Sequence, residues 1–161
     1  MENKILELLE ESSKYTAEDI AIMLGVEEKE VVATIAKLEK EKVICGYKTL
    51  INWDKVQEKE CVTALIELRV TPQRGEGFDN IAKRIYQYEE VKAVYLMSGG
   101  FDLTVIIEGR TMKEVALFVG QRLAPLEAVI STATHFVLKK YKDHDVIFED
   151  EKKDERMKVS P

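Results

Sequence analysis

Five consecutive residues, Ser98-Gly99-Gly100-Phe101-Asp102, combine groups that could recognise a small charged molecule. Two adjacent glycines let backbone N–H groups approach a ligand closely and can adopt positive φ. Exposed N–H groups suit a carboxylate, and the Asp102 carboxylate could accept a hydrogen bond from an ammonium group. Together they would bind both ends of a free amino acid. The same pattern is also typical of a plain β-turn, in which aspartate is a common turn former.

A second set of residues could contact nucleic acid. A helix is predicted over residues 28–41, with Val31, Ile35 and Leu38 on one side and basic residues opposite. The apolar side would hold this helix against its neighbours while the lysines meet phosphates, as in a helix docked in the major groove. Any surface helix also has a charged outer face. The candidate DNA contacts are Lys29, Thr34, Lys37 and Lys40, with Lys48 just beyond the helix.

A predicted helix–turn–helix would position these lysines. An apolar pattern over residues 4–11 predicts a first helix. Thr16 and Asp19 form a capping-box signal for the next helix, and Gly25 is the residue expected at its left-handed end. The same joints also fit a simple αα-hairpin in a helical bundle. Residues 43–53 are β-rich and short, which predicts a wing or a strand leading away from the helices.

The second half of the chain predicts the element order β-α-β-β-α-β. The expected strands cover residues 62–70, 91–97, 101–107 and 129–138, and the expected helices cover 78–85 and 112–123. This order makes a four-stranded antiparallel sheet with both helices on one face. The predicted fold class is therefore α+β, an N-terminal winged helix-turn-helix followed by a ferredoxin-like domain. No helix is left to cover the other sheet face, which predicts self-association.

Charge and composition divide the 161 residues into four predicted segments. Residues 1–53 are the helix-turn-helix domain, 54–60 a charged linker, and 61–142 the ligand-sensing and oligomerisation domain. Residues 143–161 are expected to be a charged, disordered tail. The net charge is -6, whereas DNA-binding proteins usually show a basic face. The acidic tail would contribute to this charge without touching the DNA-binding face.

The sequence offers few residues for metal binding, cofactor binding or catalysis. Cys45 and Cys61 lack metal-ligand spacing and are expected to be thiols in a reducing cytosol. His135 and His144 have no ligating neighbours at metal spacing, so neither a metal site nor a cofactor is expected. Phosphate-binding glycine loops and nucleophile elbows are absent, which argues against an enzyme. Without a long apolar run or a signal peptide, the protein is expected to be cytoplasmic, with no membrane association.

The ordered set of motifs resembles the Lrp/AsnC family of feast/famine transcription regulators over roughly residues 1–141. In the N-terminal half the resemblance rests on Ala21, Gly25, Val31, Ile35, Leu38-Glu39, Val43-Ile44 and Gly46-Tyr47. In the C-terminal half it rests on Val94-Tyr95, Ser98-Gly99-Gly100-Phe101-Asp102 and Ser131-Thr132-Ala133-Thr134. The chain departs from the family at four positions. Glu27 and Glu28 replace small or capping residues, Thr34 stands where an arginine is common, and Lys42 where a glycine is common.

The resemblance implies a transcription regulator whose partners are double-stranded DNA and a small-molecule effector, an amino acid or related metabolite. It implies a homodimer built by the C-terminal sheets, assembling further into tetramers or octamers. The effector would lie between subunits near the glycine turn, and Ser131, Thr132 and Thr134 could complete its site. Glu27 and Glu28 would repel phosphates, so weak DNA affinity per subunit would be recovered through the oligomer.

Two alternatives remain open on this scaffold. Proteins of the same two-domain shape include sirohaem decarboxylases, and for such an enzyme this chain offers His135, Arg110 and Arg122. The chain could also be a ligand sensor that has lost DNA binding, which the acidic start of the recognition helix favours.

Overall fold

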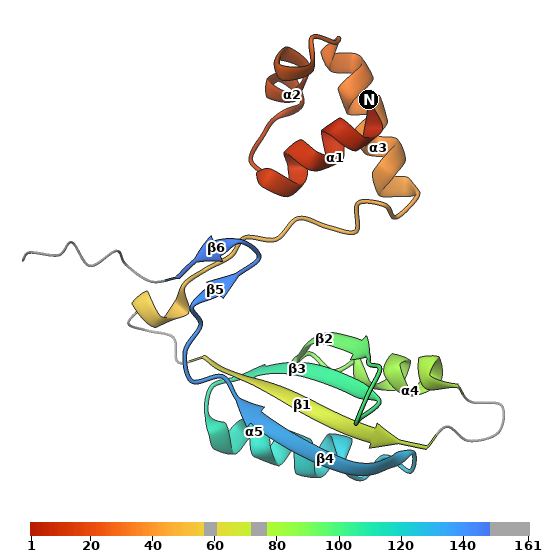
Figure 1. The fold of residues 1–161 in the computed structure, drawn as a ribbon, viewed down its shortest axis with the longest axis vertical. Coiled ribbons are helices and arrows are strands. Elements are labelled where there is room, and N and C mark those ends of the chain that lie inside the picture. Colours follow the sequence, from red (N-terminus) through yellow and green to blue (C-terminus); the bar gives the residue numbers. More distant parts are fainter. Residues whose placement is uncertain (57–60, 72–76, 149–161) are drawn as a thin grey trace, which may run out of the picture. The chain divides into compact units, whose positions relative to one another are not determined.

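A computed structural model describes residues 1–56, 61–71 and 77–148. The chain divides into two compact units, Met1–Ile51 and Asn52–Pro161, each visible in Figure 1. We call them the helical unit and the sheet unit. Residues 52–56, predicted to span the end of the first domain and the start of a linker, lie in the sheet unit. Residues 57–60 of that predicted linker lie outside the described residues.

Three helices form the helical unit: α1 (Glu2–Glu11), α2 (Ala17–Leu24) and α3 (Glu28–Lys40). Each helix contributes to one small core in which Ile5, Ile20 and Val31 are fully buried. Ala21 is also buried, and a small side chain there lets two helices pack closely. Apolar burial on this scale holds the three helices together as one unit.

Local chemistry sets both ends of α2. The backbone N–H of Asp19 donates to Thr16 Oγ1 at 3.1 Å, and the N–H of Thr16 donates to Asp19 Oδ2 at 2.8 Å. This is the predicted capping box, which satisfies two N–H groups that the helix leaves unpaired. Gly25 ends α2 with φ of 66°, in the left-handed region where glycine avoids the Cβ penalty. The predicted helix–turn–helix is confirmed.

The predicted β wing is wrong. Residues 43–51 contain no strand, and the helical unit has no other strand with which they could pair. The segment is instead held to the end of α3. The N–H groups of Val43 and Ile44 both donate to the carbonyl of Leu38, at 2.9 and 3.2 Å, and Tyr47 Oη donates to Glu39 Oε1 at 3.0 Å. A short 3-10 turn, Trp53–Lys55, follows in the sheet unit.

Lys42 lies just past α3 with φ of 59°, a left-handed conformation that L side chains adopt at a cost. Replacing Lys42 with glycine should therefore stabilise the helical unit, by about 0.5–1 kcal/mol after the greater freedom of unfolded glycine is subtracted. Urea unfolding of the full chain measures this change. Lys42→Ala is the matched control, since it removes the charge but keeps Cβ. Equal stability of the two variants would show that the backbone conformation is not the cause.

The sheet unit has the predicted ferredoxin-like order. Its elements are β1 (Val62–Val70), α4 (Phe78–Ile85), β2 (Val91–Leu96), β3 (Leu103–Gly109), α5 (Met112–Phe118), a π-helical turn (Val119–Leu123) and β4 (Val129–Phe136). The strands lie in the order β2-β3-β1-β4 and every pair is antiparallel. The predicted α+β fold class is confirmed.

Side chains of β1 alternate between the two faces of this sheet, as a pleated strand requires. Ala64, Ile66, Leu68 and Val70 are buried in one core with residues of α4 and α5, so both helices cover that face. The opposite face carries the intervening β1 residues. In the described part of the chain, the elements packed against the sheet join the first face only. We call the second face the open face.

The chain beyond β4 differs from the predicted disordered tail. Residues 142–147 form a hairpin of β5 (Lys142–Asp143) and β6 (Val146–Ile147). His144 and Asp145 have φ of 43° and 63°, the positive values that a two-residue type I′ hairpin turn needs. Lys142 Nζ also lies 2.7 Å from Asp145 Oδ1. The tail prediction was therefore wrong up to residue 148, and residues 149–161 lie outside the described residues.

None of the helices that the structure describes is long and apolar enough to cross a lipid bilayer.

Candidate DNA-binding and effector sites

The exposed side of α3 carries a narrow row of small and basic residues. Val31 and Leu38 are buried on the packed side of the helix, with 0 and 3% of their surface exposed. Opposite them, at helical spacing, lie the exposed Lys29, Ala33, Ala36 and Lys40. We call these four residues the lysine–alanine stripe. Two lysines about 16 Å apart along the axis, with alanines between them, would let the helix approach a phosphate backbone closely.

Thr34 does not belong to this stripe, which corrects its predicted exposure. Its side chain is 9% exposed, and Thr34 Oγ1 donates to the backbone carbonyl of Glu30 at 2.7 Å. The position follows Val31 by three residues and precedes Leu38 by four, so it shares their packed face. A hydroxyl bonded to its own helix is satisfied and turned away from any ligand of the stripe.

Lys37 lies on the flank of α3 rather than at its outermost side. Its Nζ atom forms an ion pair with Glu2 Oε1 of α1 at 2.8 Å. The hydrogen bond from Lys37 lowers the pKa of Glu2, and the same bond raises the pKa of Lys37. Of the predicted DNA contacts, Lys29 and Lys40 therefore share the stripe, while Lys37 already has a carboxylate partner.

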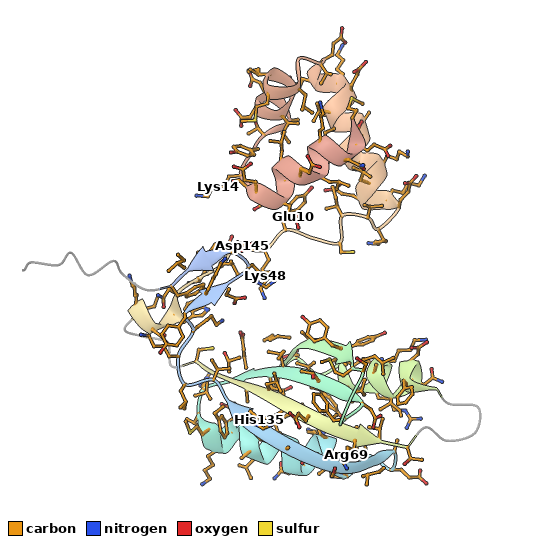
Figure 2. The ribbon with its side chains drawn as sticks, in the orientation of Figure 1. Glu10, Lys14, Lys48, Arg69, His135 and Asp145 are labelled. Atoms are coloured by element: carbon orange, nitrogen blue, oxygen red, sulfur yellow. The ribbon has the colours of Figure 1, made fainter. Side chains whose placement is uncertain are left out.

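Carboxylates border the lysine–alanine stripe. Glu28 and Glu39 lie on one flank of α3, and Glu30 lies on the other beside Lys37. Glu27 precedes the helix and makes no capping hydrogen bond with its side chain. Carboxylates near the first turn suit the helix dipole. They also confine attraction for phosphates to the stripe itself. Lys48 is exposed in the segment after α3 and is labelled in Figure 2.

A cavity of about 290 Å³ lies at the end of the sheet unit where the glycine turn meets β1 and β4. It is lined by Glu67, Arg69, Gly100, Phe101, Ser131, Thr132 and Ala133. Glu67 and Arg69 alternate with the buried residues of β1, so the cavity opens on the open face of the sheet. We call it the open-face cavity. Figure 2 labels Arg69 on β1 and His135 on the neighbouring strand β4.

The structure brings four of the predicted effector residues together in this cavity: Gly100, Phe101, Ser131 and Thr132. Ser98 and Gly99 precede them in the turn and do not line the cavity, although Gly99 has the positive φ, 131°, that the glycines predicted. Thr132 and Thr134 pair with Leu68 and Ile66, whose side chains are buried in the core, so both threonines face the helix-covered side of β4. Thr132 still borders the cavity, whereas Thr134 does not line it.

Asp102 is placed differently from the prediction. Its Oδ2 atom accepts a hydrogen bond from the backbone N–H of Val70 at 2.8 Å, and its own N–H donates to the carbonyl of Leu68 at 2.9 Å. Both bonds tie the glycine turn to the end of β1. The carboxylate therefore fixes the shape of the turn and does not line the open-face cavity.

Sequence reasoning missed Glu67, Arg69 and Ala133. A signal was present for Glu67 and Arg69, because these opposite charges alternate with the apolar residues of β1 and so lie on the face predicted to self-associate. Arg69 offers a guanidinium to a carboxylate, and Glu67 offers a carboxylate to an ammonium. Glu67 Oε1 also lies 3.3 Å from His135 Nε2 across the strand pair. The cavity is therefore lined by one cationic side chain, Arg69, and one anionic side chain, Glu67.

The residues named for a sirohaem decarboxylase do not converge. His135 lies on the open face, whereas Arg122 lies in the helical turn on the covered side, with its guanidinium carbon 5.9 Å from the ring centroid of Tyr88. Arg110 follows β3, and its backbone N–H donates to Glu114 at 2.7 Å. Within the described ranges, no three metal-binding side chains are grouped to hold an ion.

Known proteins are similar to this chain over nearly its whole length. The family described as "Lrp/AsnC ligand binding domain" matches residues 63–147, which include the whole open-face cavity. The "Uncharacterized HTH-type transcriptional regulator YugG" of Bacillus subtilis (strain 168) is 52% identical over 160 residues, covering 99% of this chain and 96% of that protein. The leucine-responsive regulatory protein of Haemophilus influenzae is 27% identical over 139 residues, covering 86% and 82%.

A solved structure shares the fold. The transcriptional regulator NMB0573 of Neisseria meningitidis, crystallised as a complex with L-Met, matches with a TM-score of 0.70 at 20% identity, covering 88% of this chain and 90% of that one. The matched domain spans more than half of this sequence, and the B. subtilis relative covers nearly all of it. On this evidence, the chain belongs to the Lrp/AsnC family of transcription regulators.

Proposed function

We propose that this protein is a DNA-binding transcription regulator that responds to an amino acid or a closely related metabolite. The observation that carries the proposal is the open-face cavity, which joins the glycine turn to one cationic and one anionic side chain. The names of the relatives support a regulatory role, and the L-Met complex of the Neisseria protein supports an amino acid as the class of ligand.

DNA binding would use the lysine–alanine stripe of α3. Lys29 and Lys40 would contact phosphates, while Ala33 and Ala36 face the groove without obstructing it. Lys37 and Lys48 would add backbone contacts at its edges. These contacts neutralise phosphates and release counterions, so affinity should fall steeply as salt concentration rises.

The open-face cavity would hold the zwitterion of the effector. Arg69 would bind the carboxylate, Glu67 would accept from the ammonium, and the Ser131 hydroxyl and nearby backbone N–H groups would orient the ligand. A volume of about 290 Å³ lies at the lower end of small-molecule sites, which suits a single amino acid better than a nucleotide.

Self-association would complete this site. The open face carries Tyr95, 56% exposed, together with the partly exposed Leu65 and Ile106. An apolar sheet face of this kind is stabilised when a second sheet packs on it. Because the open-face cavity opens on the same face, a second copy of the chain would cover the ligand, and occupancy would then bias assembly.

The test is fluorescence anisotropy of the full chain with a labelled duplex from the region upstream of its own coding sequence. Amino acids are added one at a time, and light scattering follows assembly in the same samples. We expect salt-dependent binding by an oligomer, with a several-fold change in affinity for at least one amino acid. Binding without any amino-acid response would overturn the sensing role. An amino-acid response without DNA binding would favour the alternative of a sensor that has lost DNA binding.

A further inference from the structure

One ion pair in the helical unit links the candidate DNA-binding helix to the start of the chain. Glu2 in the first turn of α1 and Lys37 in the last turns of α3 are 35 positions apart, yet their charged atoms lie 2.8 Å apart. The side chains are 47% and 53% exposed, respectively, so water and solutes can reach both. The ion pair therefore engages Lys37, which is the predicted DNA contact on the flank of α3.

We propose that Glu2 competes with DNA phosphates for Lys37 and so lowers the DNA affinity of this protein. The inference rests on the proposed use of α3 in DNA binding, and adds an internal regulator of that surface. The Glu2 carboxylate and a phosphate oxygen are both anionic acceptors of the same ammonium protons. Wherever Lys37 contacts DNA, Glu2 must either be displaced or remain as a negative charge beside a phosphate.

The position of the ion pair indicates that Glu2 competes with DNA for Lys37 and does not position Lys37 for DNA binding. Lys37 stands about a quarter of a turn from the lysine–alanine stripe, on the side where α3 faces α1. The partner on α1 therefore draws its ammonium group towards the packed side of α3 and away from Lys29 and Lys40. If Glu2 positioned Lys37 for DNA binding instead, it would be expected to hold the ammonium group beside the lysine–alanine stripe. Exposed ion pairs are weak, so a nearby phosphate can exchange with this carboxylate.

The contact with Lys37 also keeps the Glu2 carboxylate negatively charged. The hydrogen bond and positive charge of Lys37 lower the pKa of Glu2 below that of an ordinary glutamate. Glu2 consequently remains ionised across the whole neutral range, and moderate acidification does not relieve the competition. Salt does relieve it, because exposed charges are screened within about 10 Å at 0.1 M ionic strength.

The experiment compares Glu2→Gln with Glu7→Gln in the full chain. Glu7 is an exposed glutamate of the same helix and shows no ion-pair partner among the described residues. Both variants remove one negative charge, so their difference isolates the pair. The probe is a fluorescein-labelled duplex of mixed sequence, several helical turns long, because phosphate contacts do not depend on sequence. We expect Glu2→Gln to bind about two- to five-fold more tightly than Glu7→Gln at low salt, with the gap closing as salt rises.

A second pair of variants removes Lys37 as well. In the Lys37→Ala background, Glu2→Gln and Glu7→Gln should bind DNA equally, because the ammonium group for which Glu2 and DNA compete is absent. Equal binding of the two single variants would overturn the inference, and weaker binding by Glu2→Gln would show that Glu2 positions Lys37 for DNA. Both results leave the proposed function standing if the wild type binds. Absence of binding by every variant would instead overturn the proposed function, and the inference with it.

Discussion

Replacing Lys29 and Lys40 together with alanine should weaken duplex DNA binding by at least about tenfold at moderate salt. Both lysines lie at the ends of the lysine–alanine stripe, where the helix is exposed and its flanks are acidic. Each lost phosphate contact should lower the slope of log affinity against log salt by about one. The slope should therefore fall by about two for every subunit that contacts DNA. Titrations at several salt concentrations measure both quantities.

The matched control replaces Lys4 and Lys14, two exposed lysines of the same unit, with alanine. The control has the same net charge as the test variant but an intact α3 stripe. It should keep nearly the wild-type slope, because general attraction contributes less than direct neutralisation. Equal losses in the two double variants would show that DNA responds to overall charge and not to this face of α3.

Replacing Asp102 with alanine should destabilise the sheet unit by roughly 1–3 kcal/mol. The substitution removes the acceptor of the Val70 N–H at 2.8 Å and leaves that partly buried donor without its partner. The turn that carries Gly100 and Phe101 would lose one of its two hydrogen bonds to β1, so the open-face cavity should lose part of its shape. We expect lower unfolding free energy in urea together with loss of the amino-acid response.

Asp102→Asn separates structure from ligand recognition at the same position. Asparagine keeps a carbonyl oxygen that can accept from Val70, but it removes the negative charge. If Asp102 only shapes the turn, this variant should retain both stability and effector response. A stable Asp102→Asn protein that no longer responds to the effector would show that the charge itself contacts the ligand, as the sequence had suggested. Calorimetric titration with the responding amino acid distinguishes the two results.

Elements set by neighbouring residues could be predicted from the sequence. The capping box of Thr16 and Asp19 and the left-handed Gly25 use hydrogen bonds and backbone angles that involve only a few consecutive residues. The β1 strand was equally clear, because its alternation persists over nine residues. From such pieces the order of elements followed, and with it the fold class.

Features that depend on distant residues were missed or misplaced. Residues 43–51 have strand-like composition, but no second strand is present in the helical unit to accept their hydrogen bonds. The sequence pattern places Thr34 near the exposed side of α3, but packing against the other helices widens the buried stripe to include it. The pattern likewise favours a ligand for Asp102, whereas the folded chain gives it a backbone partner. Its actual partner, Val70, lies 32 positions away in the sequence.

The two ends of the described sheet unit lie together. Asn52 Nδ2 donates to the carbonyl of Phe148 at 3.2 Å, so the first residue of the unit touches the last one that the structure describes. Adjacent ends are what circular permutation requires. A short connector between residues 148 and 52 would preserve the strand pairing, and new termini could be opened in an exposed turn elsewhere. The fold of the sheet unit should therefore tolerate a change in the order in which its elements are connected.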